Sequence, residues 1–184
     1  MAFDPTISGT DANSYIPVTT ADAYFAFHLD GDQYWNNLPL AKKQAALVQA
    51  TNRIDMEMFG GRPTVDGQRL QFPRSFVVDR NKDKNQETVA EFIGGAYYRP
   101  SNVIWKEVAD ATCEMALFYL KTAAGEMTVS DDELETVTSM KVGPLDYTIK
   151  TNVKGDRLPT KVKALLSAIG PNGWAGGRPL TYDR

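Results

Sequence analysis

The sequence predicts a mainly α-helical protein: a small helical bundle around a central apolar helix at about 101–124, with one β-hairpin at about 136–150 and extended arms at both ends. Apolar side chains recur every three or four residues in separate segments, which is the period of a helix with one buried face. The period changes to two across 136–150, which is typical of paired strands. Both ends are rich in turn-forming residues and lack either period. We therefore divide the chain into an N-terminal arm (1–18), a helical domain that includes the hairpin (19–169) and a C-terminal tail (170–184).

Composition and charge limit the classes of protein that fit. A chain of 184 residues, 42% of them hydrophobic, can form one domain with its own core. Its net charge of −3 argues against a protein that wraps nucleic acid, which carries a basic excess. No apolar run approaches the roughly 20 residues that cross a bilayer, and the first residues lack the basic and apolar regions of a signal peptide. The single cysteine, Cys113, suits a reducing compartment, so we expect a soluble protein with no membrane partner.

Two helices are predicted in the first part of the helical domain. The first begins at Thr19 or Thr20, where Thr19 and Asp22 have the spacing of a capping box. Its core-facing residues are expected to be Ala23, Tyr24 and Phe27. The second has Pro39 as its first residue and ends at Gly60-Gly61, where glycine adopts the left-handed cap readily. Its core-facing residues are expected to be Leu40, Leu47, Ile54 and Met58, with Ala50 and Thr51 between them.

Residues 62–100 lack a regular period and are predicted to form a long loop. Leu70 and Phe72 are the apolar residues that we expect to hold it against the core. Asp79 to Glu87 is almost wholly polar and is expected to be solvated. Loops of this length in compact domains are usually functional or face a partner.

The central helix at about 101–124 is the strongest signal in the sequence. Ser101 is predicted to cap its N-terminus and Gly125 its C-terminus. Apolar residues cover almost its whole circumference, so the helix must be covered on several sides. One face carries Ile104, Val108, Ala111, Met115 and Phe118.

A hairpin and a last helix follow the central helix. Residues alternate in polarity on both sides of Gly143-Pro144, which predicts the turn of the hairpin. The alternating positions are Val137, Ser139, Lys141, Leu145, Tyr147 and Ile149. The last helix is predicted from about Pro159 to Ala168, and Gly170-Pro171 ends it. Its core-facing residues are expected to be Val162, Leu165, Leu166 and Ile169.

The sequence contains no complete catalytic or metal-binding motif. One histidine, His28, and one cysteine, Cys113, are too few for a zinc site, so we interpret them as structural residues. The sequence contains neither a phosphate-binding loop nor a Gly-x-Ser-x-Gly nucleophile motif. The segment from Asp79 resembles a calcium-binding loop in its oxygen spacing, but Lys84 replaces the required glycine and Ala90 the final acid. We therefore predict no catalytic residue, no metal and no cofactor, and a protein that is not an enzyme.

Nucleic-acid binding remains an alternative. Tyr97-Tyr98-Arg99 is the best local candidate for stacking on the bases of a single strand. The surrounding segment lacks a basic stripe, and the whole chain is acidic.

The order of short motifs along residues 13–169 resembles a family of head–tail connector proteins of tailed bacteriophages, also called adaptor or head-completion proteins. Related sequences are also labelled DnaT-like single-strand DNA-binding proteins. The motifs are Asn13-Ser14-Tyr15, Ala21-Asp22-Ala23-Tyr24-Phe25, Trp35, Ala46-Leu47, Ala50-Thr51, Ile54-Asp55, Phe59-Gly60-Gly61, Leu70-Gln71-Phe72-Pro73-Arg74, Ala109 to Leu117 and Val142-Gly143-Pro144-Leu145.

This resemblance implies a structural protein of the virion that is made in the host cytoplasm. Copies of the chain, commonly twelve, are expected to form a ring below the portal protein that extends the DNA channel and gives downstream tail or head-completion proteins a docking surface. DNA would pass through this ring without sequence-specific binding. The family has no catalytic residues to carry over. The alternative is a DnaT-like single-stranded DNA-binding module, and the position of the hairpin, in the lumen or at the rim, stays open.

The C-terminal tail is predicted to be the strand that docks on the portal. Its glycines and prolines prevent a helix, while spaced aromatic, apolar and arginine residues suit an extended contact with a partner. The predicted partner-binding residues are Trp174, Arg178, Leu180, Tyr182 and Arg184.

Overall fold

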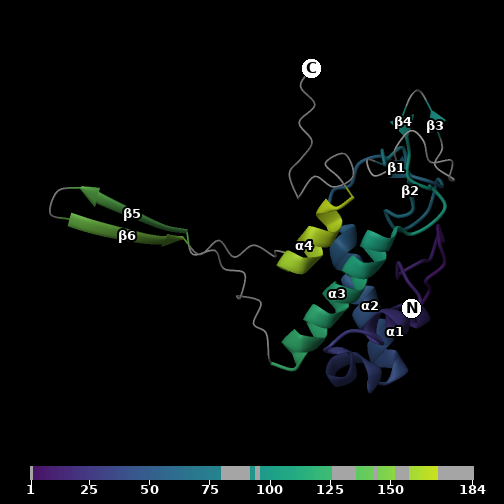
Figure 1. Ribbon diagram of the computed structural model, residues 1–184, viewed down its shortest axis with the longest axis horizontal. Coiled ribbons are helices and arrows are strands. Elements are labelled where there is room, and N and C mark those ends of the chain that lie inside the picture. The colour runs from purple at the N-terminus through teal and green to yellow at the C-terminus, as the bar shows by residue number, and fades with distance from the viewer. Residues whose placement is uncertain are drawn as a thin grey trace.

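A computed structural model of the chain describes residues 2–79, 92–93, 96–125, 136–142, 145–151 and 158–169. The fold is mostly helical and carries a two-stranded antiparallel hairpin, as the sequence predicts. Figure 1 shows the helices gathered into one body, with the hairpin lying apart from them. The helices are α1 (Val18–Phe25), the π-helix η1 (Asp32–Asn36), α2 (Leu40–Asp55), α3 (Lys106–Ala123) and α4 (Thr160–Ser167).

Helix α3 is the centre of this body, as predicted. It packs against α2 and α4 and also touches α1 and η1. Its buried side chains run along most of the helix, which fits a helix covered on several sides. They are Val108, Ala111, Thr112, Cys113, Glu114, Met115, Ala116 and Leu117.

The predicted start of the central helix is wrong, whereas its predicted end is confirmed. Helix α3 begins at Lys106, because the preceding Trp105 has an extended backbone. The Trp105 indole is held by a hydrogen bond from Nε1 to the carbonyl oxygen of Pro100 (2.8 Å) and packs edge-on against Phe72. Gly125 has a positive φ of 79°, the conformation that favours glycine just after a helix.

Helix α1 differs from its prediction in its cap and in its buried face. The N-cap is Pro17, without a side-chain bond, and Asp22 instead accepts hydrogen bonds from Trp35 and Lys43. The helix ends at Phe25, so Phe27 lies beyond it and is 96% exposed, and Ala23 is exposed as well. Val18, Ala21 and Phe25 form the buried face in their place.

Helix α2 buries Leu47, Ala50, Thr51 and Ile54, as predicted. Leu40 and Met58 are exposed instead, because Leu40 is the first helical residue and the helix ends at Asp55, three residues before Met58. Pro39 is the N-cap rather than the first residue. Gly60-Gly61 therefore does not end the helix.

Gly61 serves a close approach of two chain segments instead. Gly61 has a φ of +72°, and a Cβ atom there would lie 2.2 Å from the carbonyl oxygen of Ser75. Only glycine fits this position without strain.

The N-terminal segment has no regular secondary structure, as predicted for an arm, but part of it belongs to the core. Residues Ala12 to Ile16 are buried. The backbone N–H of Tyr15 donates to the hydroxyl of Thr51 in α2 (3.1 Å), and the Asn13 side chain accepts from the N–H of Asp4 (2.9 Å). The turn-rich composition of this stretch gives no signal for its burial.

The long loop is organised by short antiparallel strand pairs. Strand β1 (Arg62–Pro63) pairs with β2 (Arg74–Ser75), and β3 (Phe92–Ile93) pairs with β4 (Ala96–Tyr97). Leu70 and Phe72 are buried, which confirms that they hold the loop on the core. All but the first residue of the predicted solvated stretch, Asp79 to Glu87, lies outside the described residues.

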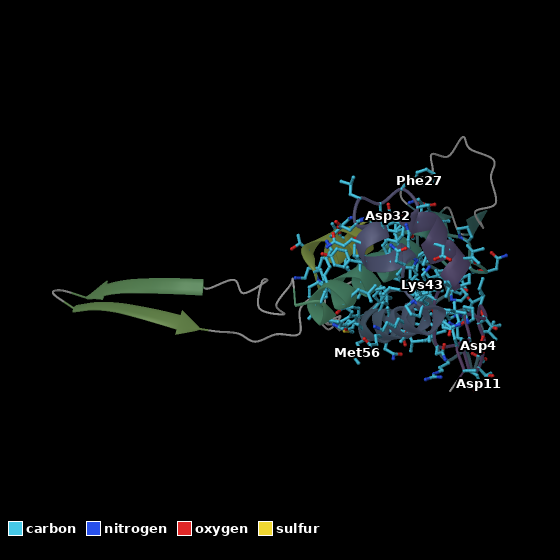
Figure 2. All side chains as sticks on the ribbon, turned by 90° about the horizontal axis from the view of Figure 1, so that it is seen from below. Asp4, Asp11, Phe27, Asp32, Lys43 and Met56 are labelled. Carbon is cyan, nitrogen blue, oxygen red and sulfur yellow. The ribbon has the colours of Figure 1, made fainter. Side chains whose placement is uncertain are left out.

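The hairpin consists of β5 (Thr136–Val142) and β6 (Leu145–Thr151), close to the predicted range, while the predicted turn at Gly143-Pro144 lies outside the described residues. It lies away from the helical body in both views (Figures 1 and 2). Helix α4 buries Val162 and Leu166, with Ile169 buried just beyond it and Leu165 partly buried, close to the prediction.

Candidate functional site

Four of the motifs that carry the family resemblance meet at one buried cluster of hydrogen bonds. The hydroxyl of Tyr15 donates to the carboxylate of Asp55 at the end of α2. The same carboxylate accepts from the backbone N–H of Gln71 (2.7 Å), which belongs to the long loop. These bonds tie the N-terminal segment, α2 and the loop to one another. We call Tyr15, Asp55, Gln71 and Arg74 the motif cluster.

Arg74 is the most connected side chain of the motif cluster. It is 6% exposed, and its guanidinium donates to four backbone carbonyl oxygens. The four acceptors are those of Phe59 (3.0 Å), Gly60 (2.7 Å), Gly61 (2.9 Å) and Gln71 (3.3 Å). A fork of donors is the feature that distinguishes arginine from lysine, so the loop is built around this residue type.

The electrostatics of the motif cluster suit a structural role. Burial raises the pKa of the Tyr15 phenol well above its usual value, and the neighbouring Asp55 carboxylate raises it further. Burial also lowers the pKa of Arg74, whose guanidinium nevertheless stays protonated at neutral pH. The Tyr15 phenol therefore stays protonated at neutral pH and donates to Asp55, and this bond joins the N-terminal segment to the end of α2.

A second polar cluster surrounds Glu114, a carboxylate buried on the central helix. Glu114 is 7% exposed and accepts the hydroxyl of Tyr24. Its Oε1 lies 2.6 Å from Lys161 Nζ and 3.3 Å from His28 Nε2. Burial, together with the bond to Glu114, raises the pKa of Tyr24. Because these partners come from α1, α4 and the turn after α1, the cluster fastens those elements to α3.

Cys113 lies where the sequence predicts it, whereas His28 lies in the turn after α1 rather than at the end of a helix. The His28 ring stacks on Tyr24 with a centroid distance of 5.9 Å beside the Glu114 carboxylate, which supports the structural interpretation. Cys113 is buried in α3, as predicted, and burial raises the pKa of its thiol. Over the part of the chain that the structure describes, no three His, Cys, Asp or Glu side chains are grouped so that they could hold a metal ion.

The ion pair between Asp30 and Lys121, next to the Glu114 cluster, is expected to make the stability of the fold depend on pH. Asp30 lies 2.7 Å from Lys121 of α3, and the hydrogen bond from Lys121 lowers the pKa of Asp30. The folded state therefore holds the Asp30 proton less tightly than the unfolded state, so stability is present above the usual aspartate pKa of 3.8 and is lost as pH falls below it. We expect the urea concentration at the midpoint of unfolding to decrease as the pH is lowered from about 5 to about 3.

The variants Asp30→Asn and Lys121→Met are expected to reduce the change of the urea midpoint with pH by a similar amount, because each removes one member of the ion pair. Urea unfolding followed by circular dichroism at each pH measures this change. Wild-type slopes in both variants would show that other carboxylates carry the dependence.

The described residues of Tyr97-Tyr98-Arg99, the candidate for stacking on single-stranded nucleic acid, lie in different surroundings. Arg99 is buried, lies 2.9 Å from Glu107 and stacks over Trp105, so its guanidinium is engaged inside the protein. Tyr98 instead packs edge-on against Phe76.

Tyr98 belongs to a surface group that the sequence does not predict. Phe76 is 47% exposed and has a positive φ of 63°, an uncommon conformation for a bulky side chain. The guanidinium of Arg62 lies over its ring, 4.7 Å from the centroid. We call Arg62, Phe76 and Tyr98 the aromatic–arginine cluster. Its members are 14 and 22 residues apart along the chain, so no local motif signals it.

Two apolar surfaces are also candidates for contact with a partner. The first is the turn after α1, where Phe27 and Leu29 are 96% and 100% exposed. The second is one face of the hairpin. The register pairs Val142 with Leu145, Met140 with Tyr147 and Thr138 with Ile149.

Positions paired across two strands lie on the same face of a hairpin, so these six positions share one face. Five of them are apolar residue types, and we call this the apolar face of the hairpin. The pairs between them, Val137–Lys150, Ser139–Thr148 and Lys141–Asp146, form a mostly polar face.

The predicted docking residues of the tail lie outside the described residues. They are Trp174, Arg178, Leu180, Tyr182 and Arg184.

The fold and these surfaces define a mainly helical protein with two clusters of hydrogen-bonded polar side chains and several exposed apolar or aromatic residues. Within the described residues, no helix is long and apolar enough to cross a membrane. Residues 3–178 match the family model described as "Putative DnaT-like ssDNA binding protein". The chain belongs to this DnaT-like family. No curated protein and no solved structure matches the chain.

Proposed function

We propose that this protein is a structural head–tail connector of a tailed bacteriophage, one copy of a ring that sits below the portal, extends the DNA channel and gives the tail a docking surface. The observation that carries the proposal is the hairpin, which lies apart from the helical body in both views. A two-stranded hairpin is marginally stable by itself in water, and this one has an apolar face. Other chains in an assembly would cover that face.

The remaining features support the same role. The motif cluster joins segments that are far apart in the sequence, which supports a scaffold role for these motifs. A net charge of −3 in each copy would leave a ring acidic overall, so that DNA is repelled from its wall and slides through. The partners are then the portal, neighbouring copies, commonly twelve, and downstream tail or head-completion proteins. We place residues 171–184 on the portal as the docking strand, in a protein located at the head–tail interface of the virion.

Electron microscopy of the chain co-expressed with the portal protein of its phage tests this role. A collar of density below the portal is expected, and portals without a collar would contradict the proposal. Deleting residues 171–184 is the further comparison, since loss of the collar without loss of the thermal melt would support the tail as the docking strand.

A matched pair of hairpin variants sharpens the test. Tyr147→Asp places a charge on the apolar face and is expected to reduce collar occupancy at least tenfold, whereas Thr148→Asp, on the other face, is expected to retain it. Both variants should keep the wild-type melt, because the hairpin lies apart from the helical body. Equal occupancy in the two variants would show that the apolar face is not covered in the assembly. Occupancy is counted in micrographs of purified complexes.

A single-stranded DNA-binding module is the second candidate, favoured by the description of the family and by the aromatic–arginine cluster. Exposed aromatic rings beside a guanidinium can stack on bases, each worth about 1–3 kcal/mol. Fluorescence anisotropy with a labelled oligo-dT at low and physiological salt tests this candidate. It requires binding that weakens steeply with salt and that falls about tenfold in Phe76→Ala. Absence of binding at low salt would remove it.

A further inference from the structure

We infer that the turn carrying Phe27 and Leu29 inserts into a groove along α2 of a neighbouring copy, so that each copy contacts the next one head to tail. This inference rests on the ring of the proposed function and names the contact that closes it. The groove lies between the N-terminal segment and α2 and has a volume of about 480 Å³.

The turn is built to display its two apolar side chains. Phe27 and Leu29 are almost completely exposed, although they flank His28, which points inward to Glu114. The turn is fixed by a hydrogen bond from the N–H of His28 to the carbonyl of Phe25 (3.1 Å) and by one from the N–H of Gly31 to the carbonyl of His28 (2.9 Å). Rigid apolar groups lose little conformational entropy on binding, so this turn is preorganised for a partner.

Gly31 makes this close turn possible. A Cβ atom at this position would lie 2.2 Å from the carbonyl oxygen of Phe25. The ion pair from Asp30 to Lys121 holds the far side of the turn on α3. The exposure of Phe27 and Leu29 is therefore imposed by the packing on both sides of them.

The groove has an apolar part that could receive the two side chains of the turn. Its apolar lining residues are Ala2, Phe3, Ala41, Ala45 and Val48, and polar side chains with Arg69 line the rest. Ala45 and Gln49 also line a neighbouring hollow of about 570 Å³ that reaches Leu38 and Leu120. Together the two hollows run along the solvent-facing side of α2.

Each surface carries a charged side chain that is opposite in sign to one on the other surface. Asp32 directly follows the turn, whereas Asp30 is already paired with Lys121. The groove and the neighbouring hollow are lined by the cations Arg69 and Lys42, respectively. A carboxylate beside the inserted turn would therefore meet a cation beside the groove, which fixes the direction of the contact.

The positions of the two surfaces favour a ring over a two-fold dimer. Figure 2 shows Phe27 on one side of the helical body and Asp4 and Asp11, which belong to the N-terminal segment that borders the groove, on the opposite side. A contact between different, opposite surfaces of identical chains is heterologous and generates a closed ring when the rotation between copies is suitable. The same chain can therefore offer its turn to one neighbour and its groove to another.

Engineered cysteines test the contact in the full chain co-expressed with its portal. The native Cys113 is buried and its thiol has a raised pKa, so it gives little background. Oxidation of the variant Leu29→Cys/Val48→Cys is expected to give a covalent ladder that extends beyond the dimer, because each copy supplies one cysteine to each of two neighbours. Each single variant is expected to remain monomeric on a denaturing gel. Met56→Cys/Val48→Cys is the matched control and is also expected to remain monomeric.

Each outcome bears on the inference separately from the connector role. Collars without a ladder would overturn the contact and leave the connector role standing. A ladder without collars would support the contact and overturn the connector role. Dimers from Leu29→Cys alone would indicate a two-fold contact between turns and overturn the head-to-tail arrangement. As a second measurement, Phe27→Asp should reduce collar occupancy at least tenfold while leaving the thermal melt unchanged, because the side chain is exposed in the free chain.

Discussion

Replacing Trp35 with alanine is expected to lower the free energy of unfolding by about 3–5 kcal/mol, the usual range for loss of a buried tryptophan. Trp35 is fully buried in η1, and its indole stacks on Phe25 with a centroid distance of 4.7 Å. Its Nε1 donates to Asp22 (2.7 Å), and Lys43 lies 5.4 Å from the centre of its ring. The substitution therefore leaves a cavity and also removes a donor from Asp22. Urea unfolding followed by circular dichroism measures the loss.

Two further variants separate the causes of this effect. Trp35→Phe keeps most of the apolar volume but loses the Nε1 donor, so we expect a smaller loss of about 1–3 kcal/mol. Met56→Ala removes an exposed apolar side chain and is expected to stay within about 0.5 kcal/mol of the wild type. A loss below 1 kcal/mol for Trp35→Ala would show that the packing between α1 and η1 is not part of the cooperative core.

Replacing Arg74 with methionine is expected to lower the free energy of unfolding by about 3–5 kcal/mol. Methionine fills a similar volume but supplies none of the donors that the guanidinium gives to the carbonyls of Phe59, Gly60, Gly61 and Gln71. Each carbonyl that is left buried without a donor costs about 1–3 kcal/mol, less where water can enter.

The Arg74 prediction has a close control in the neighbouring strand. Arg62→Met makes the same substitution at an exposed arginine of β1, and we expect a change below about 1 kcal/mol. Arg74→Lys keeps the charge and is nevertheless expected to lose most of the stability, because a single ammonium cannot reach acceptors spread around a fork. Hydrogen exchange should show faster exchange at residues 59–61 in both Arg74 variants. Wild-type stability of Arg74→Lys would indicate that charge, rather than the fork of donors, holds the loop.

Much of the helical framework follows from local pattern. The spacing of Leu47, Ala50 and Ile54 gives α2, and the apolar circumference around Val108 and Met115 gives a central helix, because helical periodicity is encoded within a few turns of sequence. The alternation around residues 143–144 likewise predicts β5 and β6. The errors lie at the ends of elements, where Trp105 and Phe27 depart from the predicted helix and the predicted core.

The candidate sites were less accessible to sequence reasoning. The sequence shows the motifs around Tyr15, Asp55 and Arg74 only in their order along the chain. That they contact one another is known from the structure, in which Tyr15 and Asp55, 40 positions apart, share a hydrogen bond. The Glu114 cluster depends on Tyr24, which is 90 positions away. A buried carboxylate on an otherwise apolar helix looks like part of a polar stripe until its partners are known.

The sequence by itself determined the mainly helical class, the central helix, the hairpin and the buried position of Cys113, because each follows from composition or from a period within one element. Only the tertiary structure decided that residues 12–16 enter the core, that Phe27 and Leu29 face outward, and that Arg62, Phe76 and Tyr98 share a surface. The physical reason is that burial belongs to a residue's whole surroundings. Whether a side chain is buried depends on its contacts with segments that are distant in the sequence. Local periodicity does not identify those segments.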